Sequence, residues 1–309
     1  MSHPTSILIT GATGLVGSTF IKLLQKTQPD RAIHILTRNP QTPHRVAGVE
    51  VKAFGWSPSD QWMNPMALEG VSHIFHLAGE PVAQRWTYSA RQRIRDSRTG
   101  ALTLLQEACK TASLAPRIVS ASAVGFYASG PENRTEDDPA GTGFLSEVVQ
   151  EWEMAAAALG ALGGGHVQFR IGLVLSARGG VLKRLLPIYR MGLGAPLASG
   201  RQFQSWIHVE DLASMLSEAL DHSEWSGAYN AVSPEVVSQR QFSRALAGAL
   251  RRPHFFPAVP AWALRLWFGK AAEALLASHN ITPSRLLELG FKFRFPTLET
   301  AFESAVTDA

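Results

Sequence analysis

The sequence is poor in cysteine, with Cys109 alone among its 309 residues. One cysteine can build neither a disulfide framework nor a cysteine-rich zinc site. Because Cys109 falls in LLQEACKTA, which has a helical pattern, we expect it to be a buried structural thiol. Histidine, aspartate and glutamate nowhere have the spacing of metal ligands, so no metal site is predicted.

Long hydrophobic runs are also missing. The longest apolar stretch begins at Val259 and is interrupted by Arg265 and Lys270, which indicates an amphipathic helix rather than a membrane span. The first strand is expected by residue 6, with no basic-then-apolar leader before it. These features together predict a cytoplasmic protein with no membrane partner.

Charge is low and scattered. Charged residues make up 17% of the chain, and the net charge of +4 comes mostly from arginine. The tightest basic run, Arg91 to Arg95, lies in an expected helix without interleaved aromatic residues. We interpret it as a solvated face, with an anionic ligand as the alternative. A nucleic-acid partner is therefore not predicted.

Strands and helices alternate along the first part of the chain. Strands are expected at 6–10, 32–37, 49–54, 73–79, 117–122 and 166–175, and helices at 15–27, 88–112 and 143–162. This alternation predicts an α/β, Rossmann-like, doubly wound parallel sheet with helices on both faces.

From residue 176 onward the pattern changes and becomes mostly helical, closing with a short strand in FKFRF, residues 291–295. We therefore expect a Rossmann domain over 1–175 and a smaller, mostly helical C-terminal lobe over 176–309. That lobe would cover the substrate, and its segment at about 205–232 would return to the sheet.

The stretch ILITGATGLVG, residues 7–17, places three glycines between an expected strand and an expected helix. Gly11 allows a tight turn, Gly14 lets the backbone approach a pyrophosphate, and Gly17 lets the helix pack closely. The helix N-terminus supplies free N–H groups for the phosphates. The residues expected to contact the dinucleotide here are Gly11, Thr13, Gly14, Leu15 and Val16.

The end of the second strand indicates which dinucleotide binds. An NAD site places an acidic residue there to bind the ribose hydroxyls. Here the strand ends with Thr37 and Arg38, and no acid is near. A guanidinium would bind a 2′-phosphate through charge-assisted hydrogen bonds, so the sequence predicts NADP(H).

Four later motifs accompany the glycine loop: HLAGEP (76–81), SASAVGFY (120–127), RIGLVL (170–175) and WIHVEDLA (206–213). With the Gly-x-x-Gly-x-x-Gly spacing, they resemble the extended short-chain dehydrogenase/reductases, a group that includes nucleotide-sugar epimerases. The resemblance is closer to an atypical subgroup, described as NAD-dependent epimerase/dehydratase-like or cell-division-inhibitor-like. It covers essentially the whole chain.

The resemblance implies a cofactor cleft with named residues. Those expected to contact the cofactor are Leu77, Ala78, Gly79, Glu80, Arg98, Ser120 and Arg170. Ser122 is the expected catalytic serine, with Ser120 as the alternative, and Tyr127 is the nearest tyrosine. Arg98 could instead form a surface ion pair, and Arg170 could instead hold the lobe in place. Glu80 could equally be a surface or capping carboxylate.

A Tyr-x-x-x-Lys pair, which the broader family uses for proton transfer, is absent. In that pair the lysine charge lowers the tyrosine pKa. None of the four tyrosines has a lysine four residues later, and no lysine occurs between Lys110 and Lys183. Alignment on Trp152 puts Leu145 and Val149 at the two positions.

Two functions fit these observations. One is an NADP(H)-dependent oxidoreductase or epimerase-like enzyme that acts on a small polar molecule beside Ser122 and Tyr127. The other is a catalytically silent NADP(H)-binding sensor or regulator, which the missing Tyr-Lys pair favours. The oligomeric state is left open, with a homodimer as one alternative.

Overall fold

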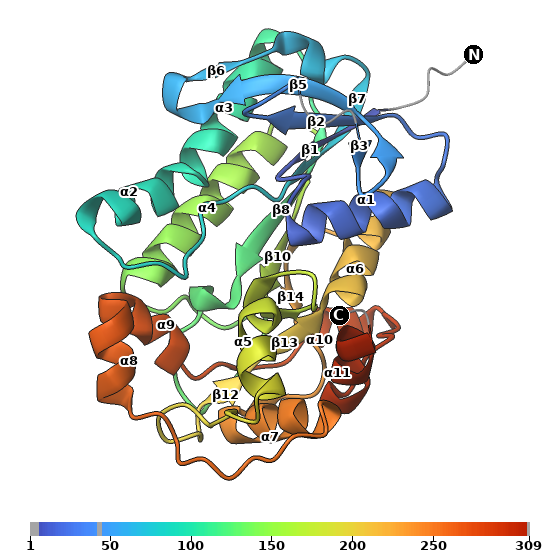
Figure 1. Ribbon diagram of the computed structural model, residues 1–309. Helices are drawn as coiled ribbons and strands as arrows, with labels where there is room; N and C mark the ends of the chain where they lie inside the picture. Colours follow the sequence, from blue (N-terminus) through green and yellow to red (C-terminus); the bar gives the residue numbers. More distant parts are fainter. Residues whose placement is uncertain (1–5, 42–44, 308–309) are drawn as a thin grey trace.

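The structure is a computed structural model that describes residues 6–41 and 45–307 (Figure 1). Within these residues an eight-stranded sheet has the strand order β14-β10-β8-β7-β1-β2-β5-β6. Its strands are β1 (Ser6–Thr10), β2 (Ile33–Thr37), β5 (Lys52–Ser57), β6 (Trp62–Met63), β7 (Val71–His76), β8 (Arg117–Ala123), β10 (His166–Ile171) and β14 (Gly227–Ala231).

All neighbouring strands of this sheet run parallel except β5 and β6. From β1 the chain adds β2 and β5 on one side, and then β7, β8, β10 and β14 on the other. The direction of winding therefore reverses between β1 and β7. In an open parallel sheet, ligands bind in the crevice at the carboxyl ends of the two strands where this reversal occurs.

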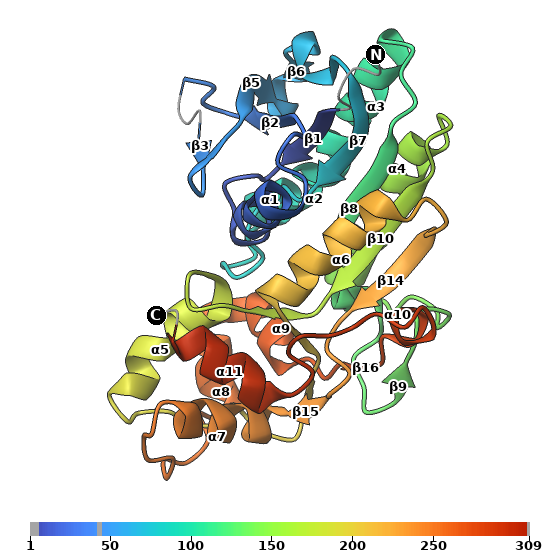
Figure 2. The same cartoon turned by 90° about the vertical axis from the view of Figure 1, so that its right-hand side faces the viewer.

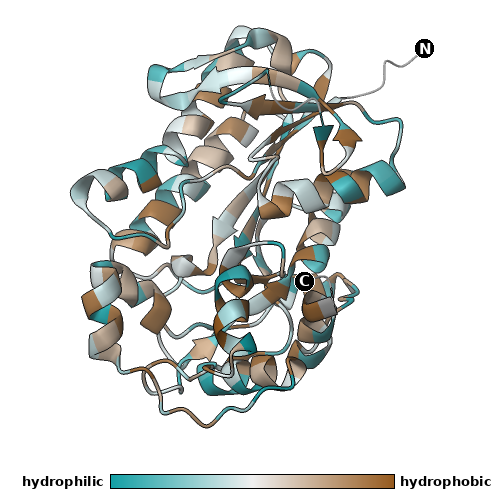
Figure 3. Cartoon of the chain, viewed as in Figure 1, coloured by the Kyte–Doolittle hydropathy of each residue, from teal (hydrophilic) through white to brown (hydrophobic). Residues whose placement is uncertain are grey.

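Helices cover both faces of the sheet (Figure 2). One face carries α1 (Leu15–Thr27) and α6 (Val209–Asp221), and the other carries α3 (Thr99–Thr111) and α4 (Phe144–Gly160), with α2 (Tyr88–Asp96) beside them. Alternate residues of β1 serve the two cores, since Ile7 and Ile9 pack on the first and Leu8 on the second. A strand covered on both faces is typically apolar along its length, as residues 7–9 of β1 are, whereas β8 and β10 also carry polar residues and have mixed colours in Figure 3.

A smaller lobe lies below the carboxyl ends of the strands in Figure 1. Its helices are α5 (Gly180–Arg190), α7 (Gln239–Ala249), α8 (Ala261–Phe268), α9 (Ala272–Leu276) and α11 (Leu298–Thr307), whereas α10 (Ser284–Glu288) packs against β14 of the main sheet. Leu186 on α5, Leu246 on α7 and Phe302 on α11 share one buried apolar cluster. This lobe therefore has a core of its own.

Short elements complete the chain. The remaining strands are β3 (Arg45–Val46), β4 (Val49–Glu50), β9 (Asn133–Arg134), β11 (Leu173–Leu175), β12 (Phe203–Gln204), β13 (Trp206–His208), β15 (Val237–Ser238) and β16 (Asn280–Ile281). The 3₁₀ turns are η1 (Pro58–Asp60), η2 (Pro65–Leu68), η3 (Val124–Phe126) and η4 (Gly269–Ala271). These strands pair outside the main sheet as β11 with β13, β12 with β15, β16 with β9, and β3 with β4.

The predicted fold class is confirmed, but several elements differ from the sequence expectation. The helix expected at 88–112 is two helices, α2 and α3. At the break the Ser97 hydroxyl donates to the Ile94 carbonyl and accepts from the backbone N–H of Glu80. The strand expected at 166–175 is interrupted at Gly172, where a Cβ atom would lie 2.6 Å from the Ser205 carbonyl oxygen. The strand expected at 49–54 is β5, displaced to Lys52–Ser57.

The expected strand at 291–295 is wrong. The Asp211 carboxylate accepts hydrogen bonds from the backbone N–H groups of Arg294 and Phe295, at 2.8 and 3.0 Å. This side chain takes the place of a neighbouring strand, although burial alternates along the segment as it would in a strand. In the 205–232 region, β14 joins the main sheet whereas β13 pairs with β11. The boundary at 175/176 stays a prediction.

Candidate functional site

The glycine loop follows β1 at the point where the winding of the sheet reverses. Gly11 has φ of +67°, and a Cβ atom there would lie 2.6 Å from the Leu77 carbonyl carbon. A Cβ atom on Gly17 would lie 2.5 Å from the Gly11 carbonyl oxygen. Both glycines are therefore required by close backbone packing, which sets the start of α1 directly against the turn.

The amino end of α1 is free to bind an anion. Gly14 is its N-cap residue, no side chain caps it, and its first turn contains no acidic residue. Thr13 and Gly14 are exposed, and Leu15 and Val16 follow at the start of the helix. Uncapped N–H groups and the helix dipole favour a phosphate here, so the residues present fit a dinucleotide pyrophosphate.

Thr10, which the sequence analysis did not single out, ties the next motif to this loop. Its Oγ1 accepts hydrogen bonds from the backbone N–H groups of Leu77 and Ala78, both at 3.2 Å. It also lies 2.9 Å from Nδ1 of the buried His76. Residues 77–79 are thereby fixed beside the glycine loop. A threonine that ends a buried strand just before a glycine loop was the signal for this role.

The end of β2 presents an unengaged cation. The Thr37 Oγ1 accepts a hydrogen bond from the backbone N–H of Asn39, which turns the chain after the strand. Arg38 is exposed, and its guanidinium contacts no acceptor among residues 6–41 and 45–307. Its position matches that expected for a residue that binds a ribose 2′-phosphate.

Arg98 packs against Gly79 on one side and lines a cavity, described below, on the other. Its Nη1 donates to the Ile94 carbonyl at 2.9 Å, and its guanidinium carbon is 5.1 Å from the centre of the Trp152 ring. A Cβ atom on Gly79 would lie 3.2 Å from that carbon, so Arg98 packs closely against the backbone at 79. Burial lowers the pKa of Arg98 to about 10, which leaves it charged at neutral pH.

Glu80 is engaged by its own loop. Its Oε1 accepts a hydrogen bond from Gln84 at 3.1 Å and lies 3.7 Å from Nε of Arg93. Its backbone N–H donates to the Ser97 hydroxyl at 2.9 Å. Ser97 thereby holds the loop after β7 against the α2–α3 break.

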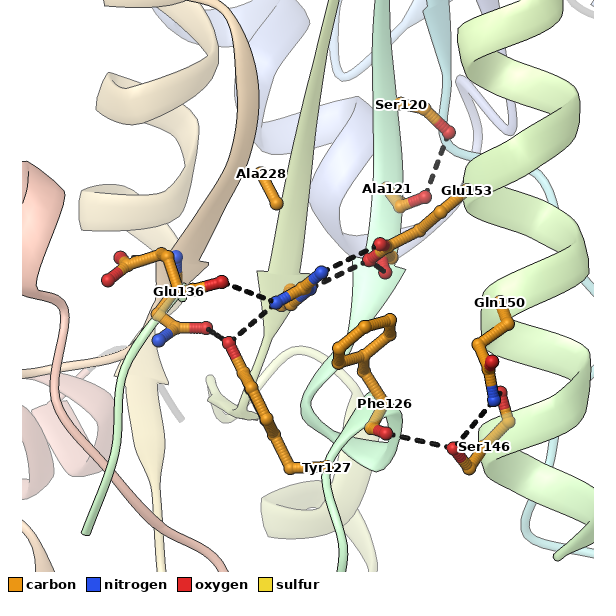
Figure 4. A network of polar contacts seen from close by, with 12 residues as sticks. Ser120, Ala121, Phe126, Tyr127, Glu136, Ser146, Gln150, Glu153 and Ala228 are labelled. Atoms are coloured by element: carbon orange, nitrogen blue, oxygen red, sulfur yellow. Dashed lines mark hydrogen bonds and ion pairs between the residues drawn. The ribbon is translucent and has the colours of Figure 1, made fainter. Parts of the chain in front are cut away.

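Both serines of β8 point into the protein. Ser120 donates its hydroxyl hydrogen to the Ala121 carbonyl at 2.8 Å, and Ser122 donates to Oε1 of Glu153 at 2.6 Å (Figure 4). Ser122 is 3% exposed and does not line the cavity described below, although its neighbour Ala123 does. The serine expected to be catalytic is thus hydrogen-bonded to a buried carboxylate.

Arg170 lies at the centre of this buried network. Its Nε and Nη2 donate to the two carboxylate oxygens of Glu153, both at 2.9 Å, and its Nη1 donates to Tyr127 and to the Glu136 carbonyl. The guanidinium carbon is 3.5 Å from the centre of the Phe126 ring. These protein partners favour the structural alternative for Arg170 over contact with a cofactor.

Tyr127 is held in the same network. Its hydroxyl donates to Oδ1 of Asn230 at 2.7 Å and accepts from Arg170 at 2.8 Å (Figure 4). Burial raises the pKa of Tyr127, although the Arg170 charge acts in the opposite direction. A tyrosine with a raised pKa and an occupied hydroxyl is a poor proton relay at neutral pH.

A cavity of about 420 Å³ adjoins the carboxyl ends of β8 and β10, bounded by α4, β12 and α9. Leu145 and Val149, which alignment on Trp152 puts at the two positions of the missing Tyr-Lys pair, both line it. Trp86 and Trp152 contribute aromatic walls, and Trp86 meets Phe144 edge-on at 5.2 Å between ring centres. The acid/base pair of the broader family is thus replaced by aliphatic side chains on the cavity wall.

The C-terminal lobe closes this cavity with residues that the sequence analysis missed. Glu273, Ala277 and His279 lie on its wall. They come more than a hundred residues after α4 and belong to no motif quoted from the sequence, so only the fold brings them to the site. Their sole sequence signal was a histidine in a mostly apolar helical tail.

The described residues contain neither a metal cluster nor a helix that could span a membrane. No group of three or more His, Cys, Asp or Glu residues within them could hold a metal ion. In the same part of the chain, every helix is too short or too polar to cross a membrane.

Comparisons with known proteins agree with this geometry. A model described as the NAD dependent epimerase/dehydratase family matches residues 7–232, and one described as a domain of unknown function (DUF1731) matches residues 259–305. An epimerase family protein of Staphylococcus saprophyticus is 36% identical, with 97% of this chain and 98% of that protein covered. One of Mycobacterium bovis is 34% identical, with 97% of each covered.

The fold is shared with a solved structure along its whole length. The crystal structure of the human epimerase family protein SDR39U1 (isoform 2) with NADPH matches with a TM-score of 0.86 at 29% identity, and covers 99% of this chain and 100% of that one. The resemblance stated from the motifs is confirmed by these matches. The chain belongs to the NAD dependent epimerase/dehydratase family and is similar to its SDR39U1-like members.

Proposed function

We propose that this protein is an NADP(H)-dependent oxidoreductase of the epimerase-like kind, acting on a small molecule in the cavity beside β8 and β10. The observation that carries the proposal is the position of the cavity. It lies at the carboxyl ends of β8 and β10, on the same edge of the sheet as the uncapped amino end of α1, which fits a pyrophosphate. Arg98 on its wall packs against Gly79, which follows β7. The related human structure with NADPH supports the choice of coenzyme.

Each part of the crevice has a role in this proposal. The backbone of residues 11–16 binds the pyrophosphate, and Arg38 binds the 2′-phosphate. Leu77, Ala78 and Gly79 line the crevice, and Arg98 stays charged at its inner end. The bound coenzyme supplies or accepts the hydride, while the walls of the cavity orient the substrate and exclude water.

The alternative is a catalytically silent NADP(H) sensor, and one observation favours it. The expected proton-transfer groups are engaged elsewhere, since Ser122 donates to Glu153 and Tyr127 donates to Asn230. A sensor needs only the crevice. In either case we place the protein in a reducing cytoplasm, where its one cysteine, Cys109, stays a buried thiol with a pKa raised to about 11 by burial.

Two measurements test the proposal. Titration of the purified chain with NADPH and NADH, followed by nicotinamide fluorescence, should give tighter binding of NADPH. Oxidation of NADPH should then be followed against a panel of carbonyl compounds and nucleotide sugars. Turnover with any of them supports the enzyme, tight binding without turnover supports the sensor, and no binding of either coenzyme refutes both.

A further inference from the structure

The cavity has walls that suit an apolar ligand. Of the described residues that line it, only Arg98 and Glu273 carry formal charge at neutral pH, and Arg98 lies at the cofactor end. Its volume of about 420 Å³ falls within the range of ordinary small-molecule sites. A nucleotide sugar brings a diphosphate and many hydroxyls, and each one buried without a partner is costly. These walls therefore fit a flat, mostly apolar molecule better.

One polar side chain, that of His279, is held in place on the cavity wall that the C-terminal lobe supplies. His279 lies between α9 and β16, and its backbone N–H donates to the Phe203 carbonyl at 3.0 Å. Its carbonyl accepts a hydrogen bond from the Ser205 hydroxyl at 2.7 Å. Because these contacts are made by the backbone, the ring is positioned without using either of its nitrogens.

The two ring nitrogens of His279 differ in their surroundings. Nδ1 is buried and has no hydrogen-bond partner among the described residues. Nε2 also makes no such hydrogen bond, but it is accessible, and His279 lines the cavity. A buried acceptor without a partner is tolerated more often than a buried N–H without one. The favoured tautomer therefore carries its proton on Nε2, as a donor to the cavity.

We propose that the cavity binds a flat, predominantly apolar carbonyl compound whose oxygen accepts a hydrogen bond from Nε2–H of His279. The substrate class rests on the oxidoreductase function proposed above, and it replaces the small polar molecule expected from the sequence. The segment matched by the domain of unknown function thereby gains a role, since it supplies both Glu273 and His279 to the substrate wall.

The protonation state of the histidine agrees with a donor role. Burial lowers the pKa of His279 to about 4, so the ring is neutral at pH 7 and keeps one N–H. A neutral imidazole can donate a hydrogen bond to a carbonyl oxygen without first taking up a proton. The aromatic walls at Trp86 and Trp152 add favourable contact with a flat ring system.

The test is equilibrium dialysis of the cofactor-free protein against 9,10-phenanthrenequinone, a flat apolar diketone, and separately against UDP-glucose. We expect the quinone to bind more tightly than UDP-glucose. His279→Leu should weaken quinone binding about tenfold, the worth of one hydrogen bond, while His279→Gln, which keeps an N–H donor, should lose about threefold or less. Thermal unfolding checks that all variants are folded.

A matched control is His222→Leu, since His222 is an exposed histidine at the end of α6 and outside the cavity. It should bind the quinone as the unmodified chain does. Equal quinone binding by His279→Leu and the unmodified chain, or tighter binding of UDP-glucose than of the quinone, would overturn the inference. Because dialysis uses no coenzyme, failure of NADPH binding or turnover would refute the proposed function without changing this result.

Discussion

The hydroxyl of Tyr127 lies 2.7 Å from Oδ1 of Asn230, and this hydrogen bond joins the turn after β8 to the edge strand β14. The same hydroxyl accepts from Arg170. The only tyrosine near the expected catalytic position is therefore used to hold the sheet together. Mutation of Tyr127 can therefore distinguish a structural role, which would change the free energy of unfolding, from a catalytic role, which would change turnover.

Tyr127→Phe should destabilise the protein without affecting coenzyme binding. It removes the hydroxyl and leaves Asn230 and one nitrogen of Arg170 without that buried partner. The free energy of unfolding should fall by about 1–3 kcal/mol, measured by urea denaturation. Tyr88→Phe is the control, because Tyr88 is 87% exposed. A loss of NADPH affinity in a fully stable Tyr127→Phe variant would contradict this reading.

Glu153→Gln should have a larger effect on stability. The Glu153 carboxylate holds Arg170 through two hydrogen bonds and also accepts one from Ser122. An amide leaves the buried guanidinium without its countercharge, which costs about 3–5 kcal/mol. Urea denaturation of Glu151→Gln gives the comparison, since the Glu151–Arg95 pair is only partly buried and should contribute less than about 1 kcal/mol. Equal losses of unfolding free energy in Glu153→Gln and Glu151→Gln would show that the buried Glu153–Arg170 pair contributes no more than the partly exposed one.

Arg38→Ala should change the choice of coenzyme. If Arg38 binds the 2′-phosphate, its loss should weaken NADPH binding by about ten- to a hundredfold and leave NADH binding unchanged. Fluorescence titration with both coenzymes measures this directly. Arg201→Ala, an exposed arginine in the other lobe, should leave both affinities as they were. A parallel loss of NADPH and NADH affinity would assign Arg38 a structural role instead.

Two glycine-to-alanine changes should have opposite effects on the free energy of unfolding. At Gly17 an added Cβ atom would lie 2.5 Å from the Gly11 carbonyl oxygen, so Gly17→Ala must displace α1 and should destabilise the fold. Gly17→Ala should also weaken the binding of NADPH and of NADH to the same extent. At Gly100, inside α3, nothing lies within 4 Å, and alanine should stabilise the helix by about 0.5–1 kcal/mol. Thermal unfolding compares the pair, and stabilisation by Gly17→Ala would refute the packing argument.

The fold could be predicted from local sequence because its causes are local. The three central residues of β1, 7–9, are apolar and buried. The glycines after the strand meet steric demands within a few residues, apart from the contact of Gly11 with Leu77. The tail was harder to predict. Burial alternates from Phe291 to Phe295 as in a strand, but the partner is a carboxylate more than eighty residues earlier, on Asp211.

The site was only partly predictable for the same reason. The glycine loop and Arg38 could be placed by their positions after the first two strands, whereas the aliphatic pair Leu145 and Val149 needed alignment with the resembling family. The network of Tyr127 required knowing that β14 adds beside β10, which no motif states. His279 lies on the cavity wall, and its backbone is hydrogen-bonded to Phe203 of β12, a contact between distant segments that no motif predicts.

Stability should fall in mild acid because buried histidines resist protonation. Burial lowers the pKa of His76 to about 3 and that of His279 to about 4, from 6.5. Between these values and pH 6.5 the unfolded chain takes up protons that the folded chain does not, so acid favours unfolding. Stabilisation from each group is full above about pH 6.5 and is lost as the pH falls. Lowering the pH from 7 to 5 should reduce the free energy of unfolding by about 2 kcal/mol for each of these two histidines.

Urea denaturation at the two pH values measures this loss, and His279→Gln separates one histidine from the rest. The variant has no imidazole at 279 to protonate on unfolding, so its loss between pH 7 and 5 should be smaller by about 2 kcal/mol. His222→Gln should not reduce the loss, because the hydrogen bond with Glu224 raises the pKa of His222 and gives the opposite sign. If the unmodified chain were equally stable at both pH values, the histidines could not be held neutral by burial.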